Sequence, residues 1–117
     1  MQRFVEPSAV GGRIKAPASK SAMQRALACA AMSSGVSTIT NPTWCADSLA
    51  AMCVAGALGA SIERLDDCVV VRGGFSMGEG LGPVVASCGE SGLCLRMFSA
   101  IAALTSREVE RLLSSRF

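Results

Sequence analysis

The sequence predicts an α/β domain built on a βαβαββ repeat that begins again before the chain ends. Stretches with apolar residues at helical spacing alternate with short β-branched runs, which is the pattern of α/β proteins. Three helical stretches each end in a small-residue turn that leads into a strand, so one unit repeats. The 117 residues suit one domain, and their 50% hydrophobic content favours a folded chain.

The first part of the sequence predicts two strands, a helix and a third strand. Residues 2–6 and 10–15 are the first two candidate strands, divided by Pro7. A helix from about Ser19 to Ser33 ends before Gly35, a common terminating residue. Its buried stripe is predicted to be Met23, Ala26, Leu27, Ala30 and Ala31. The β-branched residues 36–40 then predict a strand that ends at Asn41-Pro42.

The second half predicts a helix, a hairpin and the start of another unit. The helix runs from about Ala46 to Leu58, and the hairpin pairs residues 61–65 with 68–72. A glycine-rich loop over 73–83 leads to a buried strand at 84–86, a helix from about Ser91 to Leu104, and a strand starting near 107–110. The predicted stripes are Leu49, Met52, Cys53 and Ala57 on one helix, and Leu93, Met97, Ala100, Ile101 and Leu104 on the other.

These helices carry few charges, which indicates burial on more than one side. A chain of 117 residues has little against which to bury three such helices. We therefore expect it to form part of something larger.

Composition argues against several classes of partner. The net charge is +2, the basic residues are scattered and aromatic residues are few, so a nucleic-acid surface is not expected. No apolar run approaches the length of a membrane span, and the first residues lack the apolar core of a signal peptide. A cytoplasmic location is the expectation.

Six cysteines and no histidine restrict the chemistry. No CxxC pair is present, so a zinc site is disfavoured and no metal is expected. Without histidine there is no Ser-His or Cys-His nucleophile. We interpret the cysteines as reduced thiols that pack as small hydrophobes.

The stretch from Ala16 to Leu27 places charge and hydroxyls where a loop becomes a helix. Helix N-termini present unpaired N–H groups and bind anions. Lys20 lies at this start, and Ser21 and Arg25 are four residues apart and share a face. The set predicts a cradle for a phosphate or carboxylate. The alternative is an ordinary serine N-cap with two solvated charges.

A second helix start repeats this arrangement. Gly89 and Gly92 flank a turn with Ser91 near the cap, and Arg96 follows one turn inside the helix. The glycines allow a ligand to approach the backbone closely. The alternative is a strand-to-helix turn in which Arg96 is a surface charge.

Several motifs together resemble the amino-terminal portion of the 5-enolpyruvylshikimate-3-phosphate (EPSP) synthase family. They read PASKSxxxRALxxAAxxxGxSxIxN, an Asp, ALGAxIE, and GxSGxxxRxxxxxAAL, and they cover roughly residues 10–106. The resemblance implies the inside-out α/β barrel fold of enolpyruvyl transferases, here incomplete. It assigns residues 1–17 to first strands and a hinge that belong with the other lobe, and 18–117 to a partial lobe. The sister family that acts on UDP-N-acetylglucosamine has a different lysine motif.

The resemblance also implies an activity and a set of roles. The reaction transfers the enolpyruvyl group of phosphoenolpyruvate to the 5-hydroxyl of shikimate 3-phosphate and needs no cofactor. Lys20 would contact phosphoenolpyruvate, lie near the shikimate phosphate and share the acid–base work. Ser21 and Arg25 would bind shikimate 3-phosphate, and Gly92 would line the phosphoenolpyruvate pocket. Arg96 would support that turn, and Asp47 would be structural or near the site.

Departures from the family pattern concern the glycine turn and the length. Glu90 replaces a common Asn and should weaken anion binding unless Arg96 or Lys20 pairs with it. In the family, glyphosate occupies the phosphoenolpyruvate pocket that Gly92 would line. The large side chains of Leu93 and Met97 put the position of Gly92, and so glyphosate sensitivity, in doubt. The full-length enzyme is expected to be a monomer of several hundred residues in two lobes, so this chain is expected to be inactive alone. The alternative is a non-catalytic α/β anion-binding or interaction module derived from the family.

Overall fold

The structure is a computed structural model that describes residues 1–74, 82–105 and 108–113. The described residues form three helices and five strands, with three strands in succession between α2 and α3. They are α1 (Lys20–Met32), β1 (Val36–Thr40), α2 (Ala46–Ala57), β2 (Ser61–Arg64), β3 (Cys68–Arg72), β4 (Val84–Ser87), α3 (Gly92–Ala102) and β5 (Val109–Leu113). The predicted order of these elements is confirmed, although most of the predicted loop at 73–83 lies outside the described residues.

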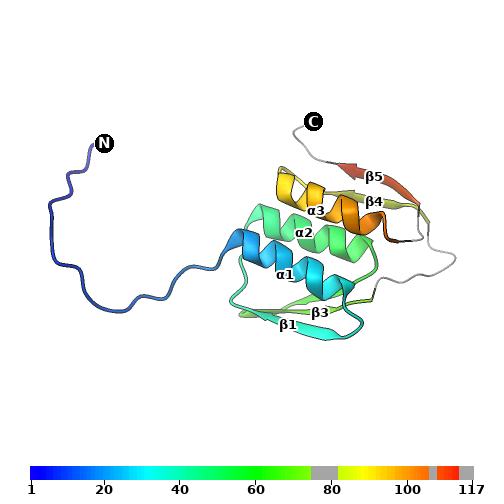
Figure 1. Cartoon of the computed structure of the whole chain (residues 1–117), viewed down its shortest axis with the longest axis horizontal. Coiled ribbons are helices and arrows are strands. Elements are labelled where there is room, and N and C mark those ends of the chain that lie inside the picture. Colours follow the sequence, from blue (N-terminus) through cyan, green and yellow to red (C-terminus); the bar gives the residue numbers. More distant parts are fainter. Residues whose placement is uncertain (75–81, 106–107, 114–117) are drawn as a thin grey trace.

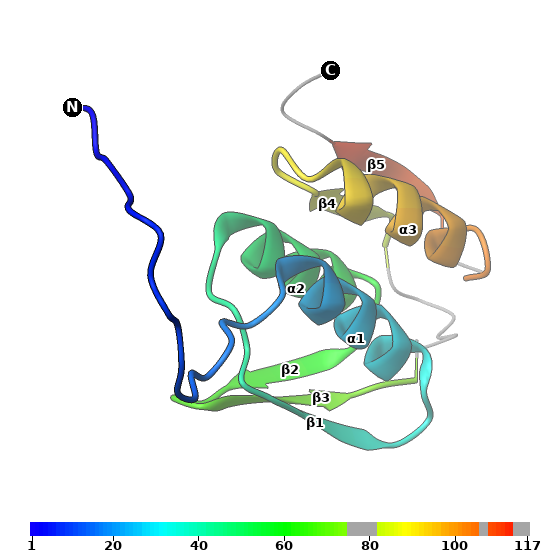
Figure 2. The same ribbon diagram turned by 60° about the vertical axis from the view of Figure 1, so that its left-hand side comes forward.

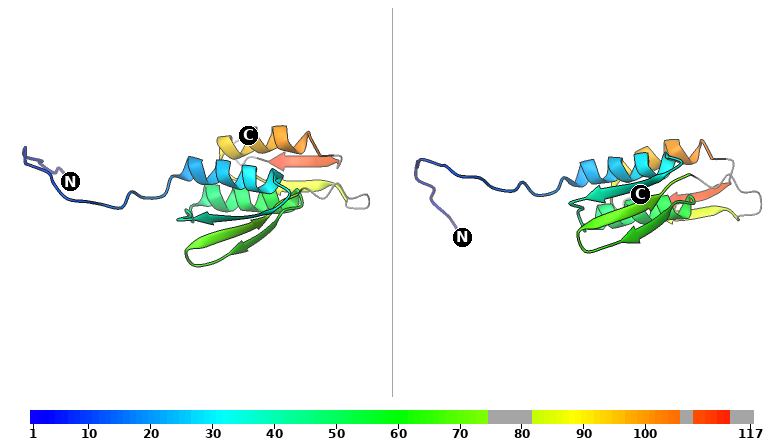
Figure 3. Two further views of the ribbon diagram at one scale, coloured as in Figure 1. Left: turned by 60° about the horizontal axis from the view of Figure 1, so that its bottom comes forward. Right: turned by 90° about the horizontal axis from the view of Figure 1, so that it is seen from below.

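The helices lie side by side in a layer between two small sheets (Figures 1 and 3). An antiparallel sheet with the order β1-β3-β2 covers one side and contacts α1 and α2. On the other side, β4 and β5 form a parallel pair that contacts α2 and α3. Figure 2 shows this second sheet behind α3. Helices inside and sheets outside agree with an incomplete inside-out α/β arrangement.

Strand β3 holds the antiparallel sheet together. It pairs with β1 from Val36 opposite Arg72 to Thr40 opposite Cys68, and β2 pairs along its other edge. Val69 and Val71 are fully buried, whereas Cys68 and Val70 are half-buried and Arg72 is exposed. One face of β3 therefore packs on the helices, as period-2 alternation predicts.

The two strands predicted before residue 16 are not formed. Residues 1–19 have no regular structure, and the segment extends away from the rest of the chain (Figure 1). Its large apolar side chains are almost fully exposed: Met1, Phe4, Val5, Val10 and Ile14. A strand needs a partner edge to satisfy its backbone groups, and no described residue pairs with this segment. The assignment of residues 1–17 to another lobe stays a prediction.

The buried faces of helices α2 and α3 agree only in part with those predicted: Met52 and Ile101 are buried, and Leu49, Ala57 and Met97 pack half-buried against the core. In α3 the buried residues are Cys94, Phe98, Ile101 and Ala102, whereas the predicted Leu104 is 72% exposed. In α2 the buried residues are Ser48, Ala51, Met52, Val54 and Ala55, and the predicted Cys53 is exposed. A helix that is apolar on most sides gives a weak hydrophobic phase, so the pattern does not decide which face is buried.

Two cysteines are buried, two are exposed, and Cys45 and Cys68 are half-buried. Cys88 and Cys94 are fully buried, and desolvation raises the pKa of both thiols. Cys29 and Cys53 are exposed, so the interpretation as packed hydrophobes is wrong for these two. Over the described ranges, the acidic and cysteine side chains form no cluster of three or more with metal-binding geometry. No described helix is long and apolar enough to cross a membrane.

Gly73 is required where the chain leaves β3. Its N–H donates to the carbonyl oxygen of Gly35 at 3.0 Å, and a Cβ at this position would overlap the backbone carbonyl oxygens of Ala30 and Ser33. Gly73→Ala is therefore expected to lower the free energy of unfolding by about 3 kcal/mol, because the backbone at Ala30 and Ser33 would have to shift to relieve the overlap.

Gly56 provides the matched control for that prediction. A Cβ on Gly56 in α2 meets nothing within 4 Å, so Gly56→Ala should stabilise the chain by about 0.5–1 kcal/mol. Urea unfolding followed by circular dichroism measures both variants. Equal stability of the two variants would contradict this close packing of α1 on Gly73.

Candidate anion-binding site

The N-terminal ends of α1 and α3 open into one polar cleft of about 430 Å³. The first turn of α2 and the turn before α3 complete its wall. Its lining residues are Lys20, Ser21, Gln24, Asp47, Glu90, Ser91, Gly92, Leu93 and Arg96. The two helix starts singled out in the sequence are therefore parts of one site.

Ser19 begins α1 and leaves Ser21 available to the cleft. The Ser19 hydroxyl accepts from the N–H of Ala22 at 3.3 Å, which makes Ser19 the N-cap. Ser21 lies one residue inside the helix and is half-buried in the cleft wall. The N-cap alternative thus accounts for Ser19 but gives no role to Ser21.

Lys20 forms an ion pair across the cleft with Asp47. The Lys20 Nζ lies 2.8 Å from the Asp47 Oδ2, and the side chains are 56% and 22% exposed respectively. The hydrogen bond to Asp47 and the charge of its carboxylate raise the pKa of Lys20. Asp47 lies in the first turn of α2, where the helix dipole favours a negative charge. The ammonium therefore lies in the cleft wall with a carboxylate as its partner.

The glycine turn is shaped by Gly89 and braced by Arg96. Gly89 has a φ of +55°, a conformation in which a side chain is strained. Ser91 caps α3 by accepting from the N–H of Cys94 at 3.1 Å. The Arg96 Nε donates to the carbonyl oxygen of Gly92 at 3.2 Å. Arg96 therefore holds the first turn of α3, and its charge lies in the cleft wall.

Gln24 is a cleft residue that the sequence analysis missed. It is fully buried, and its Oε1 accepts from the Ser91 hydroxyl at 3.1 Å. This bond joins α1 to the cap of α3. A usable signal was present, because Gln24 shares the spacing of Leu27, Ala28 and Ala31 and is a polar residue on a buried stripe.

Arg25 and Glu90 bear on the charge of the site. Arg25 lies one turn beyond Ser21 but is exposed and outside the cleft lining, so the structure does not bring it together with the others. The lining holds two cations, Lys20 and Arg96, and two carboxylates, Asp47 and Glu90. Its attraction for an anion must therefore come from geometry and from the two helix N-termini rather than from net charge.

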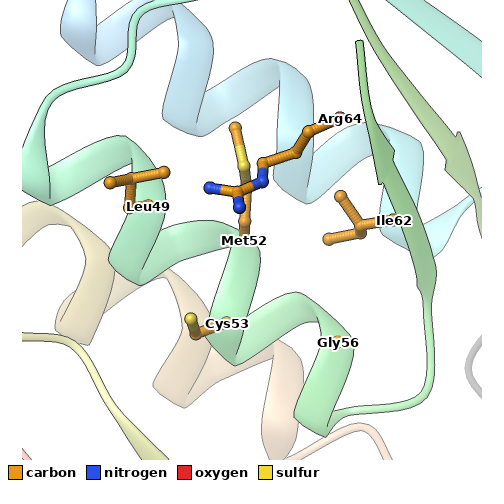
Figure 4. Close-up of a pocket in the computed structure, with 6 residues that line it drawn as sticks. All are labelled: Leu49, Met52, Cys53, Gly56, Ile62 and Arg64. Carbon is orange, nitrogen blue, oxygen red and sulfur yellow. The ribbon is translucent and has the colours of Figure 1, made fainter.

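A second hollow, of about 500 Å³, lies between α2 and β2 (Figure 4). Leu49, Met52, Cys53 and Gly56 of α2 face Ile62 and Arg64 of β2 across it. Arg64 is its one ionisable cation and the rest of the wall is mostly apolar. It lacks the converging helix N-termini of the first cleft, so we place the candidate site at Lys20.

The fold and the cleft define the class of the chain: an α/β protein with a cation-bearing polar cleft at two helix N-termini. The family model of EPSP synthase (3-phosphoshikimate 1-carboxyvinyltransferase) matches residues 5–113. The chain belongs to this family, as its motifs predicted.

Relatives and a solved structure agree with this assignment. The chain is 37% identical over 102 residues to the 3-phosphoshikimate 1-carboxyvinyltransferase of Methanobrevibacter smithii, covering 87% of this chain and 23% of the relative. That of Natronomonas pharaonis is 36% identical over 104 residues, covering 89% and 23%. EPSP synthase from Acinetobacter baumannii has a similar fold, with a TM-score of 0.69 at 23% identity over 89% of this chain and 24% of that one. The chain spans about a quarter of the length of these proteins.

Proposed function

We propose that this chain carries part of the binding site for shikimate 3-phosphate and phosphoenolpyruvate in an enolpyruvyl transfer reaction. The convergence of Lys20 with the Gly92 turn in one cleft carries this proposal. Both ligands are polyanions, and the first turns of α1 and α3 line the cleft, where helix N-termini favour anions. Ser21 supplies a hydroxyl for the shikimate phosphate, and Arg25 would join it from the exposed face of α1.

The residues of the cleft fit the charge changes of this reaction. The 5-hydroxyl must lose a proton while phosphate leaves from phosphoenolpyruvate, so negative charge must be stabilised. Lys20 can stabilise it as a charged ammonium, and the first turn of α3 adds N–H donors at Gly92. Proton transfer needs a positioned group within hydrogen-bond reach, and Lys20 is the candidate in this cleft.

We expect no turnover from the chain alone. The relatives that carry the family's name are about four times as long, so most of their groups have no counterpart here. The experiment compares this chain with a chimera in which its residues replace the matching quarter of the Methanobrevibacter smithii relative. Phosphate release is measured with both substrates present.

The chimera should be active and the chain alone inactive. Turnover by the chain alone, at a rate comparable to the relative's, would contradict the expectation that it is an incomplete site. A folded but inactive chimera would instead favour a non-catalytic anion-binding module.

Asp47 is expected to compete with a bound anion for Lys20. Asp47→Asn removes a carboxylate 2.8 Å from the Lys20 Nζ, so shikimate 3-phosphate should bind about 2- to 5-fold more tightly. The same change should lower the pKa of Lys20, since hydrogen bonding and charge from Asp47 raise it.

Isothermal titration calorimetry at pH 7 measures the affinity, with Glu63→Gln on the exposed face of β2 as the control for loss of one negative charge. Weaker binding by Asp47→Asn than by Glu63→Gln would mean that Asp47 orients Lys20 instead.

A further inference from the structure

Only the oxygen of the buried Gln24 amide has a hydrogen-bond partner in the described part of the chain. Its Oε1 accepts from the Ser91 hydroxyl at 3.1 Å, while its Nε2 has no hydrogen-bond partner in the described part of the chain. Gln24 is 0% exposed, so water does not satisfy this nitrogen from the bulk. A buried donor without a partner costs stability, and proteins retain very few of them.

The surroundings of Gln24 indicate which kind of ligand group can accept a hydrogen bond from this nitrogen. It belongs to the lining of the polar cleft, one turn from Lys20 and next to Ser91. The groups around that cleft include two helix N-termini and two cations, which attract oxyanions, beside the carboxylates of Asp47 and Glu90. An amide NH₂ is a donor only, so the ligand group that completes it must be an acceptor oxygen.

The other half of the amide links the two helix starts. The Ser91 hydroxyl donates to Gln24 and accepts from the N–H of Cys94, so the α3 cap depends on a side chain of α1. A ligand that engages Gln24 would therefore act on the turn that carries Gly92. Hydrogen-bond networks of this kind orient neighbouring groups more narrowly than isolated bonds do.

We propose that Gln24 is a ligand-binding and positioning residue of the cleft: its NH₂ donates to an oxygen of the bound phosphorylated substrate, and its carbonyl oxygen fixes the glycine turn through Ser91. This inference rests on the proposed function, because it takes shikimate 3-phosphate as the ligand. It adds an uncharged hydrogen-bond donor to the charged groups of the proposed binding site.

Side-chain amide resonances test the proposal directly on the whole chain. The sequence contains only Gln2, Gln24 and Asn41 with side-chain amides, so a ¹⁵N spectrum shows three NH₂ pairs. The Gln24 pair is identified by its loss in Gln24→Leu. Adding shikimate 3-phosphate should move the Gln24 pair downfield and leave that of Gln2, in the exposed amino-terminal segment, unchanged.

Affinity provides the second measurement. Gln24→Leu should bind shikimate 3-phosphate about 10-fold more weakly, as expected for loss of a hydrogen bond to a charged oxygen. Ser48→Ala is the control, because Ser48 is a buried polar residue of α2 outside the cleft lining. It should lose stability in urea but retain affinity, and the same result for Gln24→Leu would show that Gln24 is purely structural.

The outcomes separate this inference from the proposed function. If the Gln24 NH₂ resonances do not move at saturating shikimate 3-phosphate, or if Gln24→Leu binds it with unchanged affinity, the inference is overturned. The proposed function still stands in that case, provided that the ligand binds at Lys20 and Ser21. No binding of shikimate 3-phosphate to the wild-type chain overturns both. If Gln24→Leu does not fold, the wild-type resonances, assigned by through-bond correlation to the Gln24 backbone, decide the matter.

Discussion

Replacing Lys20 with alanine is expected to weaken binding of shikimate 3-phosphate by about 10- to 100-fold. A hydrogen bond between charged groups contributes about 1.5–3 kcal/mol, and each 1.4 kcal/mol changes the dissociation constant tenfold. The loss falls toward the upper end because Asp47, now without the ammonium 2.8 Å away, remains as a negative charge beside the ligand. Isothermal titration calorimetry at low ionic strength gives both affinities.

The chain supplies its own control for this charge change. Lys15 is the only other lysine, and it lies in the exposed segment before α1. Lys15→Ala removes the same charge and should change affinity less than about 2-fold, since Lys15 is exposed and lies outside the cleft lining. Similar losses in both variants would show that Lys20 acts only through net charge and has no special place in the cleft.

Phe98→Ala is expected to lower the free energy of unfolding by about 3–5 kcal/mol. Phe98 lies in α3 with 0% of its surface exposed and is among the largest fully buried side chains. Truncation removes its apolar contacts and leaves a cavity that close-packed neighbours fill only partly. Since small domains are stable by about 5–15 kcal/mol, this loss is a large fraction of the total stability of the chain.

Leu104→Ala is the matched test at a residue that the sequence predicted to be buried and that the structure exposes. Leu104 follows α3 and is 72% exposed, so its truncation should change stability by no more than about 0.5 kcal/mol. Urea midpoints measured by circular dichroism compare the two variants. A larger effect at Leu104 than at Phe98 would mean that the face predicted from the sequence, and not the one in the structure, forms the core.

The order of elements was predictable because it depends on local signals. The strand at 36–40 and the hairpin over 61–72 contain β-branched residues bounded by turn residues, and the structure places strands there. The buried faces of α2 and α3 were predictable only in part, since Met52 and Ile101 are buried as predicted whereas Cys53 and Leu104 are exposed. Both helices are apolar on several sides, and burial then depends on which neighbours pack against them. The strands predicted before Ala16 failed because a strand also needs a partner edge.

The site was predictable in its parts but not in its assembly. Helix N-termini bearing Lys20 and Gly92 are visible as motifs, yet only the fold shows that they share a cleft. The pairing of Lys20 with Asp47 joins residues on two helices, and no spacing rule predicts it. Gln24 was missed because the predicted stripe of α1 contained only apolar residues, and a polar side chain was not expected in it.

Titration of the ¹⁵N-labelled chain with shikimate 3-phosphate tests the central claim most directly. If the cleft at the two helix N-termini is the binding site, backbone amide shifts should concentrate at Lys20, Ser21, Ser91 and Gly92 and saturate. High salt should weaken the binding, because the contacts are between charged groups. No shift at millimolar ligand, or shifts that cluster at Leu49, Gly56 and Ile62 along the hollow between α2 and β2, would contradict the account.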